Sequence, residues 1–81
     1  MRPDDVLRLL RARPFQPFRI WLSDGKDYEI RHPEMAIVSR STVSLGIPGP
    51  RGPEGPAERV VTCALVHITR MELLDGASTA T

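Results

Sequence analysis

Hydrophobic and polar residues alternate along two short runs near the middle of the first half of the chain. The first run covers residues 18–22, the second covers residues 27–31, and Asp24-Gly25 lies between them. Alternation with period two is typical of half-buried β-strands. Asp-Gly between such runs favours a tight type I′ turn, which requires positive φ angles. The sequence therefore predicts a β-hairpin.

Before this hairpin the hydrophobic spacing is helical. Val6, Leu9 and Leu10 fall at i, i+3 and i+4, and Pro3 is suited to the first turn of a helix. Acidic residues gather at the start of the segment and arginines at its end, which complements the helix dipole. We expect a short helix over residues 3–13, which must dock its apolar face because it is too short to be stable alone.

After the hairpin, His32-Pro33-Glu34 interrupts the extended pattern, since proline has no amide proton. Residues 35–38 and 42–45 then read as short strands. The polar link at residues 39–41 is either a turn or a bulge.

Residues 59–65 form a further strand candidate that is apolar on both faces. This pattern suits a strand buried on both sides or one at a subunit interface, and the sequence leaves both open. Residues 66–68 are expected to turn before a last strand at 69–74, with a helix from Leu65 onward as the alternative. The small, polar residues 75–81 are expected to be a disordered tail.

Four successive Gly-X-Y triplets occupy residues 46–57. They resemble a collagen repeat, but a triple helix needs three chains and a much longer run. We expect a flexible loop with a polyproline bias. Lengthening a short turn to this size costs only about 1 kcal/mol in loop closure, so the fold can carry it.

At 81 residues the chain is one domain with a modest core, which we place at residues 1–74. The elements predict a mostly β (α+β) fold. A short N-terminal helix precedes a five- to six-stranded antiparallel small barrel or curved sheet of SH3-like or Sm-like form, with strands within residues 18–45 and 58–74.

The segments 14–20, 22–25 and 28–34, with an echo at 66–70, resemble a family of short bacterial proteins that has no established activity. The resemblance implies a shared fold. The order of elements is also similar to the Sm-like and Hfq-like barrels, which form RNA-binding rings. Their second-strand glycine and their lysine-histidine pair have no clear counterpart here, so this second resemblance implies the architecture without the RNA site.

Charge, cysteine content and apolar runs indicate which partners and which cellular compartment to expect. The chain has ten arginines, one lysine and ten acidic residues, so its net charge is +1. This charge by itself indicates no partner. Cys63 is the only cysteine, so no intramolecular disulfide can form and a reducing cytoplasm is the expected location. No apolar run approaches the roughly 20 residues of a membrane span, and the N-terminus has no apolar signal core.

Catalytic patterns are missing from the sequence. His32, Glu34, Cys63 and His67 lack the spacing of metal ligands, and no local motif places a base beside a nucleophile. The glycines recur with proline and do not form a phosphate-binding loop. We therefore expect no enzyme activity, metal or cofactor. An enzyme with a site completed between subunits is the third class of function to be weighed.

Trp21 and Arg19 are expected on the strand face opposite to Phe18 and Ile20, with Arg31 beside them. An aromatic ring flanked by arginines can stack a base or hold a phosphate, but it can equally cover a helix or a neighbouring subunit. We expect a non-enzymatic interaction module that self-associates or binds a protein partner. The alternative is a module for single-stranded RNA or DNA. The candidate contact residues are Arg8, Arg11, Arg13, Arg19, Trp21 and Arg31.

Overall fold

The structure, a computed structural model, describes residues 1–74 and is mostly β with one short N-terminal helix, as the sequence predicts. The disordered tail expected at 75–81 lies outside the described residues. The elements are α1 (Pro3–Arg11), β1 (Phe18–Leu22), β2 (Asp27–Ile30), η1 (Pro33–Met35), β3 (Ala36–Val38), β4 (Thr42–Gly49), β5 (Gly52–Ala64), η2 (Leu65–His67) and β6 (Ile68–Leu73). Two single-turn 3₁₀ helices lie between strands, η1 between β2 and β3 and η2 between β5 and β6.

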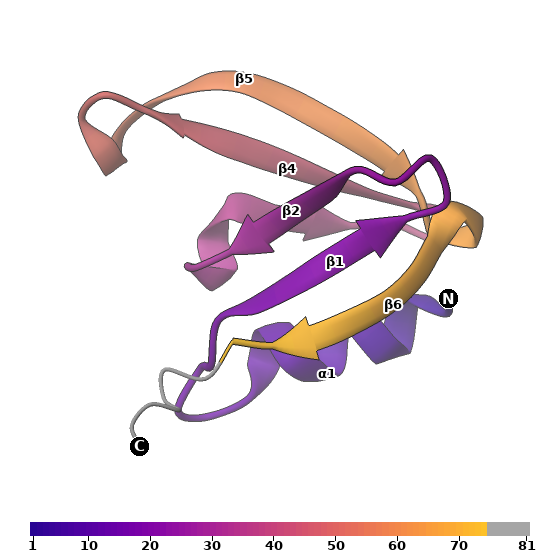
Figure 1. Cartoon of the computed structure of the whole chain (residues 1–81). Helices are drawn as coiled ribbons and strands as arrows, with labels where there is room; N and C mark the ends of the chain where they lie inside the picture. Colours follow the sequence, from indigo (N-terminus) through magenta and orange to yellow (C-terminus); the bar gives the residue numbers. More distant parts are fainter. Residues whose placement is uncertain (75–81) are drawn as a thin grey trace.

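The strands form two three-stranded antiparallel sheets (Figure 1). Sheet A has the order β2-β1-β6, and sheet B has the order β3-β4-β5. The chain passes from sheet A to sheet B through η1 and returns through η2. The described strands do not close into a barrel, because no pairing joins one sheet to the other.

The inner faces of both sheets enclose one hydrophobic core. Sheet A contributes Phe18, Ile20 and Ile30, which are at most 2% exposed. Antiparallel strands alternate side chains between the two faces, so these residues share one side of the sheet. Strand β6 of the same sheet adds Ile68, and the remaining buried core residues come from the other elements: Val6, Val43, Leu45, Cys63 and Leu65.

Helix α1 closes one side of this core through Val6, which is 1% exposed. Its first turn is held by the Arg2 amide, which donates to the Asp5 carboxylate at 3.1 Å. The helix ends at Arg11, two residues earlier than predicted, with Ala12 extended. Pro14 disfavours the helical conformation of Arg13, the residue before it, so the helix has to end before that residue. No helix within residues 1–74 is long and apolar enough to cross a bilayer.

The predicted β1–β2 hairpin is present, but its type I′ turn is wrong. The Gly25 amide donates to the Leu22 carbonyl at 3.0 Å and the Leu22 amide to the Lys26 carbonyl at 2.8 Å. Within this turn only Gly25 has a positive φ, at 90°. A type I′ turn would need a positive φ at Asp24 as well. The connection is therefore a three-residue loop, a type I turn followed by a glycine bulge.

The flexible loop expected at residues 46–57 is also wrong, since these residues extend the β4–β5 hairpin. The chain reverses at Gly49-Pro50-Arg51-Gly52, with Gly52 at a φ of 74°. Glycine and proline tolerate an extended backbone, and prolines fit where a strand is an edge or bulged. The register shifts on either side of Pro48, so the prolines interrupt the pairing without ending the hairpin.

Candidate interaction surfaces

Trp21 lies at the centre of the outer face of sheet A. Its indole nitrogen donates a hydrogen bond to the Glu72 carboxylate at 2.9 Å. The Arg70 guanidinium lies 4.7 Å from the ring centroid and that of Arg19 lies 5.8 Å away. Such contacts are attractive because the aromatic face carries partial negative charge. The ring is thus already engaged by neighbours on its own sheet.

The arginines on the outer face of sheet A are paired with carboxylates, and the Arg70 Nε lies 3.5 Å from the Glu72 carboxylate. Arg19 forms an ion pair with Glu29, and its Nε lies 3.2 Å from Asp27 without an aligned hydrogen bond. Arg31 also contacts Glu29, at 3.0 Å. The hydrogen bond from Arg19 lowers the pKa of Glu29, and the same bond raises the pKa of Arg19. This face therefore carries charges of both signs and little net charge.

The helix arginines lie in a different part of the molecule. Arg8 contacts Asp5 at 3.1 Å along α1. Arg11 and Arg13 line a groove of about 420 Å³ at the end of the helix, which Phe15 also lines. The six predicted contact residues are thus divided between the outer face of sheet A and α1 with this groove.

The outer face of sheet B differs because the residues that pair across β3, β4 and β5 on this face carry no charged side chain. Ile37 is opposite Ser44, and Ser44 is opposite Thr62, so the three share a face. The Ser44 and Thr62 hydroxyls are 3.0 Å apart. We call this surface the uncharged face; it consists of Ile37, Thr42, Ser44, Gly46, Val60, Thr62 and Ala64.

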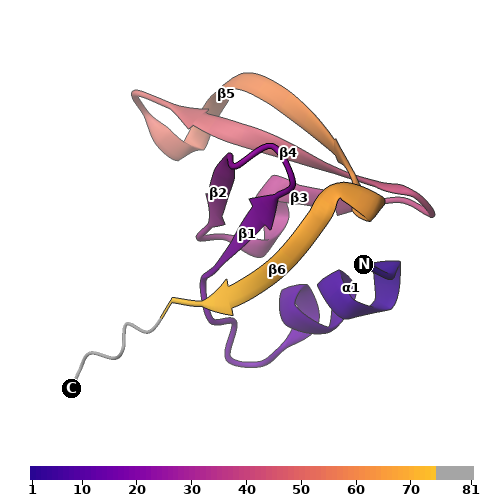
Figure 2. The ribbon, with the colours of Figure 1, turned by 45° about the vertical axis from the view of Figure 1, so that its right-hand side comes forward.

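Two large hydrophobic side chains stand exposed on the uncharged face, Ile37 at 72% and Val60 at 67%. In both views α1 lies at the opposite side of the molecule from the β4–β5 hairpin (Figure 2). Residues 59–65 are not buried on both sides in the single chain, because Cys63 is buried but Val60 is not. Ile37 is not among the candidate contact residues predicted from the sequence, although its place in a short predicted strand was a usable signal.

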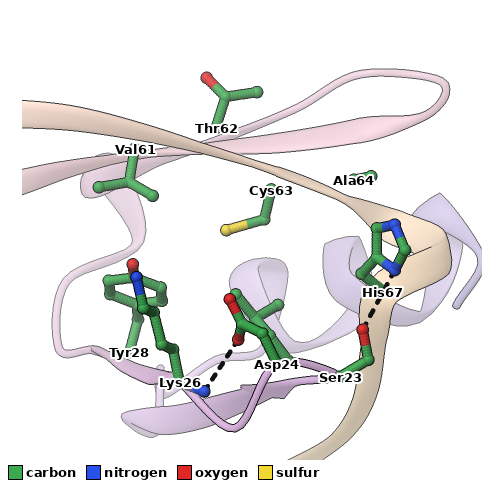
Figure 3. Close-up of a pocket in the computed structure, with 10 residues that line it drawn as sticks. Ser23, Asp24, Lys26, Tyr28, Val61, Thr62, Cys63, Ala64 and His67 are labelled. Atoms are coloured by element: carbon green, nitrogen blue, oxygen red, sulfur yellow. Dashed lines mark hydrogen bonds between the residues drawn. The ribbon is translucent and has the colours of Figure 1, made fainter.

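A cavity of about 350 Å³ lies between β5 and the β1–β2 turn (Figure 3). The Ser23 hydroxyl and the His67 Nδ1 are 3.1 Å apart at one end of it. Burial raises the pKa of the Cys63 thiol, and the Asp24 carboxylate adds to that shift. A buried, protonated thiol is a poor nucleophile. The remaining lining residues are Leu22, Lys26, Tyr28, Val61, Thr62 and Ala64.

The residues considered for catalysis do not converge within one chain. His32 and Glu34 line a separate cavity of about 150 Å³ under the tip of the β4–β5 hairpin. Cys63 and His67 line the cavity beside β5. Among residues 1–74 no group of three histidine, cysteine or acidic side chains is placed to hold a metal ion.

Comparison with models of known families, with curated proteins and with solved structures finds no match to this chain.

Proposed function

We propose that this chain is a non-enzymatic interaction module that self-associates through the uncharged face of sheet B. The observation that carries the proposal is the exposure of Ile37 and Val60 on a face whose cross-strand paired residues carry no charge. Exposed apolar patches on small proteins mark contact surfaces. The partner to which we commit is a second copy of the chain.

The arrangement of strands supports an SH3-like or Sm-like type of module. Strand β1 pairs with both β2 and β6, and β4 pairs with both β3 and β5. The 3₁₀ helix η2 joins β5 to the final strand. Two three-stranded sheets that share a core in this order form the general plan of such small barrels, although fold alone does not assign a function.

The physical case for a second copy rests on the missing charges. When a surface meets its own copy about a two-fold axis, each charge on it can meet a like charge. The uncharged face avoids this repulsion and also avoids the cost of desolvating ions. Fully burying an exposed valine or isoleucine contributes about 1.5–3 kcal/mol, and a symmetric dimer would bury two of each.

The test is the oligomeric state measured by sedimentation over a range of concentrations. We expect the parent chain to associate reversibly and Val60→Lys to associate at least about tenfold more weakly, because a lysine would be desolvated in the contact. Val66→Lys is the matched control, since Val66 is 80% exposed on η2 and outside the uncharged face. A parent chain that stays monomeric at every concentration would overturn the proposal. Equal weakening by both variants would also count against this surface.

Binding of single-stranded RNA or DNA has weaker support. Arg19, Arg31 and Arg70 each lie beside a carboxylate. A phosphate would have to compete with these carboxylates. Fluorescence polarisation with a labelled oligonucleotide at low salt tests the alternative: binding that falls steeply with added salt would favour it over a purely protein-binding role.

A further inference from the structure

The two edges of β5 differ in their backbone hydrogen bonding. One edge pairs with β4 from Thr42 to Gly49, and the other pairs with no strand among the described residues. The Leu65 amide donates to the Ser41 carbonyl at 2.8 Å, which fixes the phase of the ladder. In an antiparallel pair, hydrogen-bonded and non-hydrogen-bonded residues alternate. Val61 and Cys63 therefore bond to β4.

The same alternation directs the amides and carbonyls of Val60, Thr62 and Ala64 away from β4. The short distance between the Ser44 and Thr62 hydroxyls agrees, because side chains approach most closely in non-hydrogen-bonded pairs. No other described residue bonds to the backbone of Thr62 or Ala64. These groups form a free edge that can accept a strand.

This stretch of edge has none of the usual protection against added strands. Exposed edges are commonly blocked by charges, prolines, bulges or shortness. Strand β3 is only three residues long, β2 carries Asp27 and Glu29, and β6 carries Arg70 and Glu72. The first half of β5 contains prolines and a register shift. Residues 60–64 contain no charge, proline or glycine.

The cavity beside β5 lies along this free edge. Four consecutive residues, Val61 to Ala64, line it. Because side chains of successive strand residues point to opposite faces, a cavity that touches all four follows the edge of the strand. Its far wall is formed by the β1–β2 turn and by Tyr28 (Figure 3).

We propose that the edge of β5 at residues 60–64 binds an extended peptide segment of a partner protein by strand addition. Backbone hydrogen bonds to Thr62 and Ala64 would hold the segment. Alternate side chains would enter the 350 Å³ cavity beside Val61 and Tyr28. In this mode the main chain supplies affinity and the pocket supplies specificity. The segment is free of proline where it pairs and has an apolar side chain at alternate positions.

The walls of the cavity favour a single extended chain over a second copy at this edge. If β5 of a second copy paired with this edge, the β4 strand of that copy would lie on the far side of the added strand, about 5 Å further from the edge. The β1–β2 turn, with Ser23 and Asp24 on the cavity wall, stands on that side. A free segment carries no second strand. The inferred site therefore goes beyond self-association through the uncharged face.

The experiment uses a fluorescent peptide of alternating threonine and valine with a lysine at each end, acetylated at its N-terminus and amidated at its C-terminus. Binding of this peptide to the protein is measured by fluorescence polarisation. We expect Thr62→Pro to bind at least about tenfold more weakly than the parent, because proline removes an outward amide and distorts the edge. Proline at a free edge leaves the bonds to β4 intact. Thr62→Ala is the matched control, since it also loses the hydroxyl contact to Ser44 but keeps the amide.

Two readouts keep the test decisive if Thr62→Pro folds poorly. The same peptide with its valine amides methylated should bind the parent chain at least about tenfold more weakly. Hydrogen exchange at the Thr62 and Ala64 amides should slow when the unmodified peptide binds. Equal binding of both peptides, no protection of these amides, or no binding by the parent would overturn the inference. If the parent chain binds the peptide but is strictly monomeric, only the self-association proposal is refuted. If the parent chain does not bind the peptide and Thr62→Pro loses self-association, the edge is assigned to a second copy of the chain.

Discussion

The outer face of sheet A surrounds Trp21 with arginines and carboxylates, whereas the uncharged face of sheet B exposes Ile37 and Val60 among small polar residues. Both sheets have three antiparallel strands and the same core beneath them. The difference lies entirely in residues that do not determine the core. The charged groups on the outer face of sheet A form ion pairs within the chain, whereas two large apolar side chains on the uncharged face of sheet B are exposed to solvent.

The largest effect is expected in the core that the two sheets share. Ile20→Ala on sheet A and Leu45→Ala on sheet B each remove a side chain that is at most 1% exposed. Each should lower the free energy of unfolding by about 2–5 kcal/mol. Chemical denaturation followed by Trp21 fluorescence and by circular dichroism should give one coincident transition for each variant. Transitions that separate between the two probes would show that the sheets unfold independently.

A smaller effect is expected from removing the centre of the outer face of sheet A. Trp21→Ala eliminates the packing of a half-buried ring and its contacts with Arg19 and Arg70. Each cation–π contact is worth about 0.5–1 kcal/mol at such sites, so with the packing of the ring the loss should be at least about 1–2 kcal/mol. Thermal unfolding by circular dichroism measures it.

The control for Trp21→Ala on sheet B is Val60→Ala. It should leave monomer stability unchanged within about 0.5 kcal/mol, because Val60 is 67% exposed in the single chain. It should instead weaken self-association. If Val60→Ala destabilised the dilute protein as much as Trp21→Ala does, the two outer faces would not differ in the way proposed.

Much of the fold could be predicted from local patterns. The helical spacing of Val6 and its neighbours, the alternation along 18–22 and the Asp-Gly turn all act over a few residues. The β4–β5 hairpin could not be predicted in this way. Gly-Pro triplets have no hydrophobic period, and their strand conformation depends on pairing between Gly46 and Val60, which are distant along the chain.

The candidate surfaces, like the fold, could be predicted only in part from local sequence patterns. The alternation of Arg19 and Trp21 with Phe18 and Ile20 placed them on one strand face, where the structure has them. The carboxylates that pair with the arginines come from β2 and β6, and the β6 pairing of Glu72 could not be read from a local pattern. The free edge of β5 likewise depends on which strands are absent beside it, and only the sheet order gives that information.

The smallest expected effect is a pH dependence that separates the two sheets. On sheet A the pKa of Glu29 is lowered from its usual value of 4.5, chiefly by the hydrogen bond from Arg19. A carboxylate with a lowered folded-state pKa contributes stability above its unfolded pKa and loses it as the pH falls. The melting temperature of the parent should therefore decrease below about pH 4.5 more than that of Glu29→Gln, by a modest amount because the pair is partly exposed.

On sheet B the corresponding titration lies at the other end of the scale. Burial raises the pKa of the Cys63 thiol from its usual value of 9.0. A group whose folded-state pKa is raised contributes stability below its unfolded pKa and loses it as the pH rises. Cys63→Ala should thus flatten the alkaline side of the stability profile above about pH 9 and leave the acid side unchanged, while Glu29→Gln does the reverse. Thermal melts from acid to alkaline pH would contradict this division if either substitution altered both sides equally.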